Sequence, residues 1–95
     1  MEYKECLICK NRADHTHHLI CGGTNGKRHL ADEDNLTAEL CYICHGIAHT
    51  KVGVMEKYKQ IGQLIYEIRQ MTMYDCTAEQ ARERFMKRYG KNYIW

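Results

Sequence analysis

The sequence contains no proline, no low-complexity segment and no internal repeat, so nothing in its composition divides its 95 residues into separate parts. It also has no apolar run near the roughly 18 residues that a membrane span requires, which excludes a spanning helix. The opening Met1-Glu2-Tyr3-Lys4-Glu5 is mixed in charge and lacks the apolar stretch of a secretory signal. We therefore expect a reduced, cytoplasmic protein with no membrane partner, whose cysteines are thiols or metal thiolates rather than disulfides.

A large excess of charge of one sign is also missing, because the net charge is only +2. The two halves differ, however. Residues 1–50 carry five Lys and Arg against seven Asp and Glu, and residues 51–95 carry nine against five. A basic second half attracts phosphate modestly. A solvated helical surface explains the same charges equally well, so charge alone does not identify a nucleic-acid partner.

Cysteine and histidine are abundant instead, with six of each in the chain. A chain of this length is near the lower limit for folding on a hydrophobic core alone. A metal, disulfides or a partner chain often stabilises such small domains. Five of the cysteines and all six histidines lie in residues 1–50. This half is predicted to contain loops, short strands and metal ligands.

The second half is predicted to be helical. Apolar residues recur at steps of three and four over residues 54–71, which indicates an amphipathic helix long enough for a homodimer interface. Thr77-Ala78-Glu79-Gln80 is a capping box that begins another helix, and Gly90 ends it. We expect one domain, with a core over residues 1–52 and a helical extension over residues 53–95. The Tyr93-Ile94-Trp95 end is expected to pack back on it.

Two C-x-x-C motifs, Cys6-Leu7-Ile8-Cys9 and Cys41-Tyr42-Ile43-Cys44, are separated by 31 residues. Two residues between cysteines let both sulfurs reach one metal ion from a tight turn. Two such turns complete a tetrahedral four-thiolate zinc site with no open position. We therefore expect a structural Zn²⁺ that ties the start of the chain to its middle. A neighbouring histidine could replace one thiolate. Cys21 and Cys76 have no partner at ligand spacing and are interpreted as plain thiols.

The histidines are grouped as well. His17 and His18 are adjacent in a strand-like run, and His45 and His49 follow the second C-x-x-C motif with three residues between them. In a helix that begins near Tyr42, this spacing places both imidazoles on one face, where they can bind one divalent ion. Adjacent side chains of a strand point to opposite faces, so His17 and His18 can share a site only where the strand ends or bulges.

Two further histidines each have two interpretations. His15 lies two residues before His17, on the same face of the predicted strand, and is either a fourth ligand or a surface residue. His29 follows Lys27 and Arg28 and is either a contact to phosphate or an ordinary loop residue.

Three segments carry a family resemblance: Thr16-His17-His18-Leu19-Ile20, Asn35-Leu36 and Leu40-Cys41-Tyr42-Ile43-Cys44-His45-Gly46-Ile47-Ala48-His49. They resemble the HNH, or ββα-metal, endonuclease family, especially its small zinc-containing members from phages and prophages. The resemblance covers roughly residues 3–52. It implies an α+β fold, with a ββα-metal core that holds the four-cysteine zinc site and is followed by two C-terminal helices.

The resemblance also implies roles for individual residues. His17, His45 and His49 would bind the catalytic metal, His18 would be the general base that activates water, and Asn35 would orient this base. Asn35 is one residue further from the second C-x-x-C motif than in the commoner family spacing. Asp34 or Asn25 could therefore take its place.

The implied function is a metal-dependent DNA endonuclease that hydrolyses phosphodiester bonds, by nicking or double-strand cleavage, in a bacterial or phage-infected cell. A divalent Mg²⁺, Mn²⁺, Ni²⁺ or Zn²⁺ would stabilise the phosphate and the leaving group, and Lys27 and Arg28 would contact DNA. The alternative is a non-catalytic zinc-binding module that interacts with DNA or a protein. A zinc deaminase is disfavoured, because no histidine is followed two residues later by the glutamate that such enzymes require.

Overall fold

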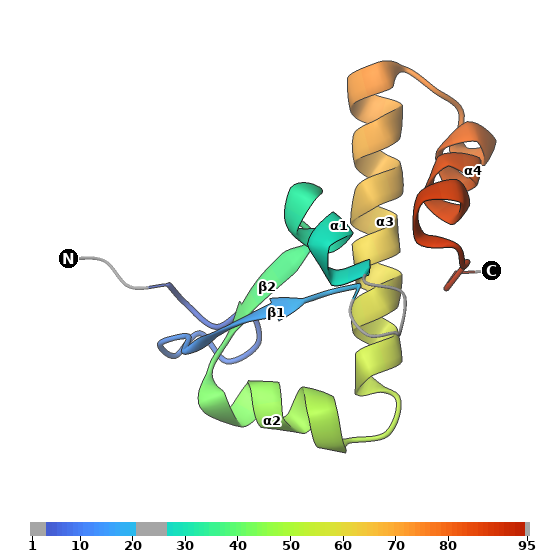
Figure 1. Cartoon of the computed structure of the whole chain (residues 1–95). Helices are drawn as coiled ribbons and strands as arrows, with labels where there is room; N and C mark the ends of the chain where they lie inside the picture. The colour runs from blue at the N-terminus through green and yellow to red at the C-terminus, as the bar shows by residue number, and fades with distance from the viewer. Residues whose placement is uncertain (1–3, 21–26, 95) are drawn as a thin grey trace.

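The computed structural model describes residues 4–20 and 27–94 of the chain. Its architecture is α+β, with a two-stranded sheet and four helices in this described part (Figure 1). The elements in chain order are β1 (His15–His18), α1 (Lys27–Glu33), β2 (Thr37–Leu40), α2 (Tyr42–Thr50), α3 (Val54–Tyr74) and α4 (Ala78–Tyr89).

The two strands are antiparallel, and His15 pairs with Leu40 while His18 pairs with Thr37. β1 therefore ends at His18. The end of a strand is one of the two places where the adjacent side chains of His17 and His18 can share a site. The sequence did not predict α1, which lies in the connection between the strands. This helix is only seven residues long, and so short a segment shows no apolar periodicity from which a helix could be predicted.

α2 directly follows β2 and begins at Tyr42, as predicted. Cys41 is its N-cap, and the Cys41 sulfur accepts a hydrogen bond from the amide of Cys44 at 3.4 Å. The residue that caps the helix is thus also one of the predicted metal ligands. Any ion bound by Cys41 and Cys44 would hold the first turn of the helix that carries His45 and His49.

α3 runs the length of the molecule, with the strands, α1 and α2 on one side and α4 on the other (Figure 1). The predicted helix over residues 54–71 is confirmed and extends to Tyr74. Only part of its predicted apolar face is buried, however: Tyr58 is buried, whereas Ile61, Leu64 and Ile68 are exposed. Although α3 has 21 residues, no helix in the described part of the chain is apolar enough to cross a membrane.

α4 has the boundaries that the sequence predicted. The capping box is present, with the Thr77 hydroxyl accepting from the Gln80 amide and the Gln80 side chain accepting from the Thr77 amide. Gly90 ends the helix with a φ of 78°, a left-handed conformation that glycine adopts without steric cost. The predicted helix stop is therefore confirmed.

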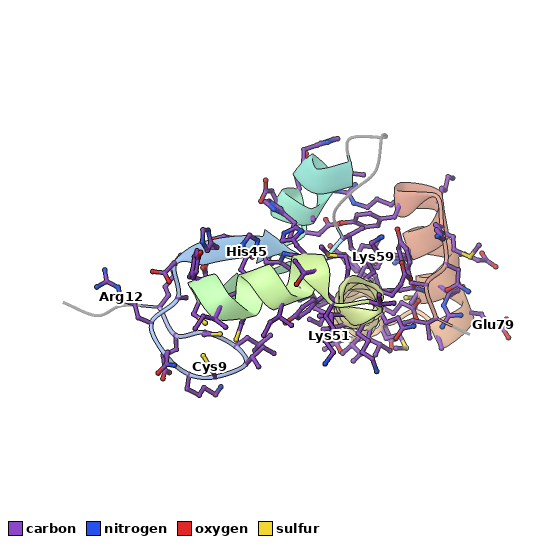
Figure 2. All side chains as sticks on the ribbon, turned by 90° about the horizontal axis from the view of Figure 1, so that it is seen from below. Cys9, Arg12, His45, Lys51, Lys59 and Glu79 are labelled. Atoms are coloured by element: carbon purple, nitrogen blue, oxygen red, sulfur yellow. The ribbon has the colours of Figure 1, made fainter. Side chains whose placement is uncertain are left out.

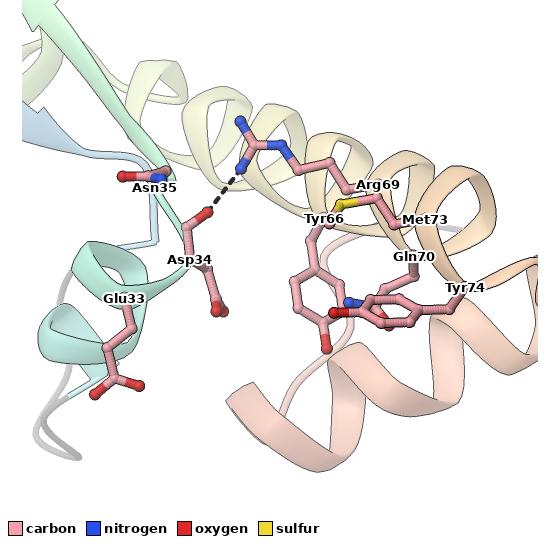
Figure 3. A pocket seen from close by; sticks show the side chains of 8 residues that line it. All are labelled: Glu33, Asp34, Asn35, Tyr66, Arg69, Gln70, Met73 and Tyr74. Atoms are coloured by element: carbon pink, nitrogen blue, oxygen red, sulfur yellow. Dashed lines mark hydrogen bonds between the residues drawn. The ribbon is translucent and has the colours of Figure 1, made fainter.

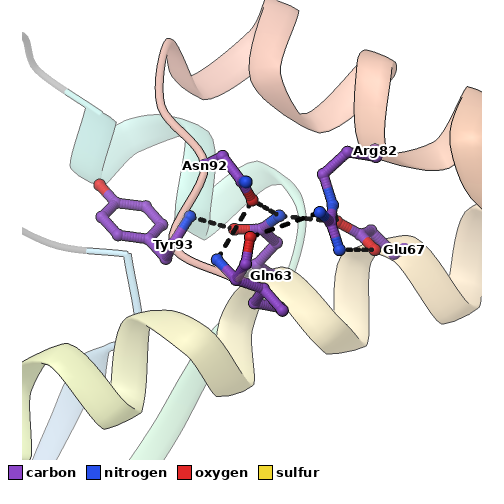
Figure 4. A network of polar contacts seen from close by, with 6 residues as sticks. Gln63, Glu67, Arg82, Asn92 and Tyr93 are labelled. Atoms are coloured by element: carbon purple, nitrogen blue, oxygen red, sulfur yellow. Dashed lines mark hydrogen bonds and ion pairs between the residues drawn. The ribbon is translucent and has the colours of Figure 1, made fainter.

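A buried polar network joins α4 and the C-terminal residues to α3 (Figure 4). The amide nitrogen of Gln63, a fully buried side chain, donates to Glu67 and to Asn92, each at 2.7 Å. The Gln63 oxygen accepts from the backbone amide of Tyr93 at 2.7 Å, and Arg82 binds Glu67 at 2.7 Å. Packing of the chain end back on the domain is thus confirmed for Tyr93, while Trp95 lies outside the described residues.

Gly62 allows α3 to approach the end of β1 closely. A Cβ at this position would lie 2.9 Å from Ile20 Cδ1 and 3.0 Å from Leu19 Cβ, whereas a Cβ at Gly46 would have no atom within 4 Å. Overpacking costs about 1–3 kcal/mol, and alanine favours a helix over glycine by about 1 kcal/mol. We expect Gly62→Ala to lower the free energy of unfolding by up to about 2 kcal/mol, and the control Gly46→Ala to raise it slightly. Urea titrations followed by circular dichroism measure both; equal effects would contradict the close contact.

Candidate metal centres

Four cysteine sulfurs form the first cluster. The sulfurs of Cys6, Cys9, Cys41 and Cys44 all lie within 4.8 Å of one another, and those of Cys9 and Cys41 are 3.5 Å apart. In a tetrahedral site with zinc–sulfur bonds of about 2.3 Å, the sulfurs are about 3.8 Å apart. The donor set and its spacing therefore fit the predicted ion, and the cluster could hold a structural metal ion such as zinc.

Backbone hydrogen bonds fix the positions of both pairs of cysteines. In the first pair, the Cys6 carbonyl accepts from the amide of Lys10, which has a φ of 68°, and the Leu7 amide donates to the carbonyl of Glu39 in β2. The tight turn is thus fastened to the sheet. In the second pair, Cys41 and Cys44 lie at the start of α2. The cluster therefore links the N-terminal loop, the sheet and this helix.

The thiols of the cluster differ in acidity. Burial opposes ionisation of Cys6, but amide hydrogen bonds from Cys9, Cys41 and Ile8 outweigh it and lower the pKa of the Cys6 thiol to about 6. Burial, followed by hydrogen bonds to neighbouring sulfurs and the charge on Cys6, raises the pKa of Cys44 to about 12. One thiolate at neutral pH thus opposes ionisation of the next, and a bound cation would offset this repulsion.

Three histidines form the second cluster. His17 comes from β1, and His45 and His49 come from α2; each offers a ring nitrogen, and these atoms lie within 4.8 Å of one another. The Nε2 atoms of His45 and His49 are 3.1 Å apart, and His17 is buried, with 3% of the residue exposed. Figure 2 shows His45 on the β1 side of α2 and Cys9 in the N-terminal loop. The three rings could hold a metal ion.

The surroundings of His45 favour a neutral ring, the form that binds metals. Burial, together with the positive charge that His49 and His15 would carry, lowers the pKa of His45. The exposed His15 ring stacks on His45, with centroids 4.5 Å apart and an angle of 24° between the ring planes. His15 is thus a neighbour of the cluster and is not one of its three grouped ligands.

Tyr58 of α3 packs against the three-histidine cluster. Its ring centroid is 5.1 Å from that of His17, and the side chain is buried. Burial, followed by negative charge on Cys44 and Cys6, raises the pKa of the Tyr58 phenol. The sequence showed Tyr58 only as one member of the apolar stripe, because its contact with His17 depends on how α3 packs.

The predicted base, His18, points to a different neighbour. The sequence placed it beside the metal ligands, but the structure groups His17 with His45 and His49 without His18. Nε2 of His18, the last residue of β1, lies 2.8 Å from Oδ1 of Asp32 in α1. The sequence analysis missed Asp32; the acidic run Asp32-Glu33-Asp34 before Asn35 was the pattern that could have drawn attention to it.

In the described part of the chain, neither Asn35 nor Asp34 forms a hydrogen bond with His18. Asn35 occupies a turn with a φ of 55°, a conformation that asparagine tolerates better than most residues. Asp34 accepts from Arg88 and from the Tyr89 hydroxyl, at 2.7 and 2.6 Å. Both line a hollow of about 330 Å³ beside α3 (Figure 3). The structure thus pairs the predicted base with Asp32 in place of Asn35 or Asp34, and Asn25, the other candidate, lies outside the described residues.

The predicted DNA contacts and thiols are only partly described. Lys27 and Arg28 form the start of α1, but their side chains lie outside the described part of the chain, as does Cys21. Cys76 is half-buried between α3 and α4, and His29 is an exposed residue of α1, not of a loop.

Arginines of the basic second half hold the helices together. Arg82 binds Glu67, Arg88 binds Glu33 and Asp34, and Arg69 donates to the Asp34 carbonyl. Part of the excess positive charge is therefore paired within the protein, and fewer cationic side chains of the second half remain to bind phosphate.

Comparisons with models of known families, with curated proteins and with solved structures find no match to this chain. Its function is therefore inferred from the geometry of the two clusters.

Proposed function

We propose that the chain is a metal-dependent DNA endonuclease of the HNH type, which hydrolyses phosphodiester bonds at the three-histidine cluster. The observation that carries this proposal is the convergence of His17, His45 and His49 from two elements, with ligand atoms within 4.8 Å. Three protein ligands leave positions open for water and substrate, which is typical of catalytic sites, whereas four thiolates close a site. A binding module has no need for such an open site.

A divalent ion held by the three histidines would polarise the phosphate and stabilise charge on the leaving 3′ oxygen. His18 is the proposed base; it is the last residue of β1 and directly follows the ligand His17 in the chain. A water molecule gives a proton to the His18 ring, and its oxygen forms the new bond to phosphorus. The bond to the 3′ oxygen breaks, and this oxygen leaves with the electron pair and takes a proton from solvent.

The four-cysteine cluster supports this site through α2. Cys44 and His45 are adjacent, so a structural ion bound at the first turn would fix the orientation of the helix that presents His45 and His49. In this proposal Lys27 and Arg28 of α1 contact the DNA backbone, and the exposed Ile61, Leu64 and Ile68 of α3 are the surface available for a homodimer.

Metal-dependent relaxation of a supercoiled plasmid tests the proposal. We expect zinc-loaded wild type to nick or cut the plasmid when Mg²⁺, Mn²⁺, Ni²⁺ or Zn²⁺ is added, and His45→Ala and His49→Ala to reduce the rate at least about 100-fold, because ligand loss should exceed the effect of losing a ligand's supporting contact. Glu83→Ala, an exposed change on α4, is the control and should cleave as wild type.

Unchanged cleavage by both histidine variants would refute the three-histidine site. If wild type is inactive with every metal but shifts DNA in a gel, the alternative of a non-catalytic zinc-binding interaction module replaces the nuclease.

A further inference from the structure

A carboxylate on α1 holds the proposed base. The Nε2 atom of His18 and Oδ1 of Asp32 are 2.8 Å apart, a distance in the range of hydrogen bonds between charged partners. The His18 side chain is 15% exposed, whereas that of Asp32 is 62% exposed. The histidine is thus enclosed on the side of the strand where α1 lies, and its carboxylate partner faces solvent.

The position of Asp32 follows from the way α1 is anchored. Ala31, the preceding residue, is fully buried, and its carbonyl accepts from the amide of Leu36 at 2.8 Å. The left-handed turn at Asn35 closes the helix and leads into β2. Asp32 therefore lies on a helix that is fixed immediately before and after it, which limits the movement of its carboxylate relative to β1.

The neighbouring acids have other partners. Glu33 and Asp34 bind Arg88, at 3.0 and 2.7 Å, from α4. Asp32 is the member of this acidic run that turns to β1. The three adjacent carboxylates are thus divided between a contact that packs helices together and a contact to the proposed base.

We propose that Asp32 is a positioning residue that fixes the tautomer of His18, an inference that rests on the proposed function. An ionised carboxylate can only accept hydrogen bonds, so the hydrogen of the neutral ring lies on Nε2 and the lone pair on Nδ1. Nδ1 is then the atom that takes the proton from water. After the transfer, the adjacent carboxylate stabilises the positive ring, as a carboxylate does when it orients a histidine base.

In this arrangement Asp32, and not Asn35, orients the base His18. An asparagine side chain is neutral and could present either its oxygen or its amide hydrogens to the ring. A carboxylate leaves no such choice and adds a charge that favours the protonated ring in the transition state.

Asp32→Asn tests the proposal, because it preserves size and removes the charge. We expect kcat for plasmid nicking to fall about 10–100-fold with KM nearly unchanged. Nitrogen-15 NMR of the neutral His18 ring should show the hydrogen on Nε2 in wild type and a mixture of tautomers in Asp32→Asn. The double variant His18→Ala/Asp32→Asn should be no slower than His18→Ala alone.

Glu33→Gln is the matched control, since it removes an equally exposed carboxylate, at 60%, from the next position of α1. It should leave both kcat and the His18 spectrum as in wild type. Equal losses in the two variants, or a His18 tautomer that Asp32→Asn does not change, would overturn the positioning role. The NMR measurement does not require cleavage, so it decides the role of Asp32 even if the nuclease proposal fails.

Discussion

Removal of the ion from the four-cysteine cluster should unfold the domain, and Cys9→Ser should have nearly the same effect. Structural zinc contributes about 10–16 kcal/mol in small zinc domains, and small proteins have a total stability of only about 5–15 kcal/mol. The cluster joins the N-terminal loop, β2 and α2, so its loss releases all three. Cys9 is the suitable ligand to change because its exposed side chain contributes little packing, whereas Cys6 is fully buried.

Elemental analysis and circular dichroism with a strong chelator measure this effect. We expect wild type to retain one tightly bound zinc per chain and to lose helical signal when the zinc is removed. Cys76→Ser is the control, since this thiol lies outside the cluster, and it should keep both zinc and signal. A chelated protein that melts at the temperature of the untreated one would disprove the structural role of the metal.

Replacement of His18 by alanine should abolish most cleavage without loss of metal. A general base contributes about 10²–10⁴-fold, so we expect a fall of this size in kcat. His18 is not among the grouped ligands of the second cluster, and the affinity for the second, weaker ion should therefore remain that of wild type. Plasmid relaxation gives the rate, and calorimetric titration with Mn²⁺ gives the affinity.

His49→Ala provides the comparison, because it removes a ligand from α2 and should weaken both cleavage and Mn²⁺ binding. If His18→Ala weakens Mn²⁺ binding as strongly as His49→Ala does, His18 is a ligand and another group must activate the water. Cleavage at the wild-type rate by His18→Ala would exclude it as the base.

Features that depend on spacing within one turn could be predicted from the sequence. The two C-x-x-C pairs, the four-residue step from His45 to His49 and the capping box at Thr77 were each recognised correctly as local geometry. Each needs only the conformation of a few consecutive residues, which residue type and spacing largely define. The same reasoning placed the start of α2 at Tyr42 and the end of α4 at Gly90.

Features that depend on contacts between distant segments were decided by packing. Asp32 meets His18 because a helix too short to show periodicity lies against β1. Tyr58 packs against His17 from α3, and Gly62 lets the same helix come close to Leu19 and Ile20.

Residue spacing was thus enough to identify the four cysteines and the pair His45 and His49 as possible metal ligands, whereas His17 was assigned to that pair by the family resemblance. Only the folded arrangement turned His18 toward Asp32 and used Arg82 and Arg88 for helix packing. The physical reason is that secondary structure arises from neighbours in sequence, whereas the direction of a side chain at the end of a strand depends on which distant element packs against it.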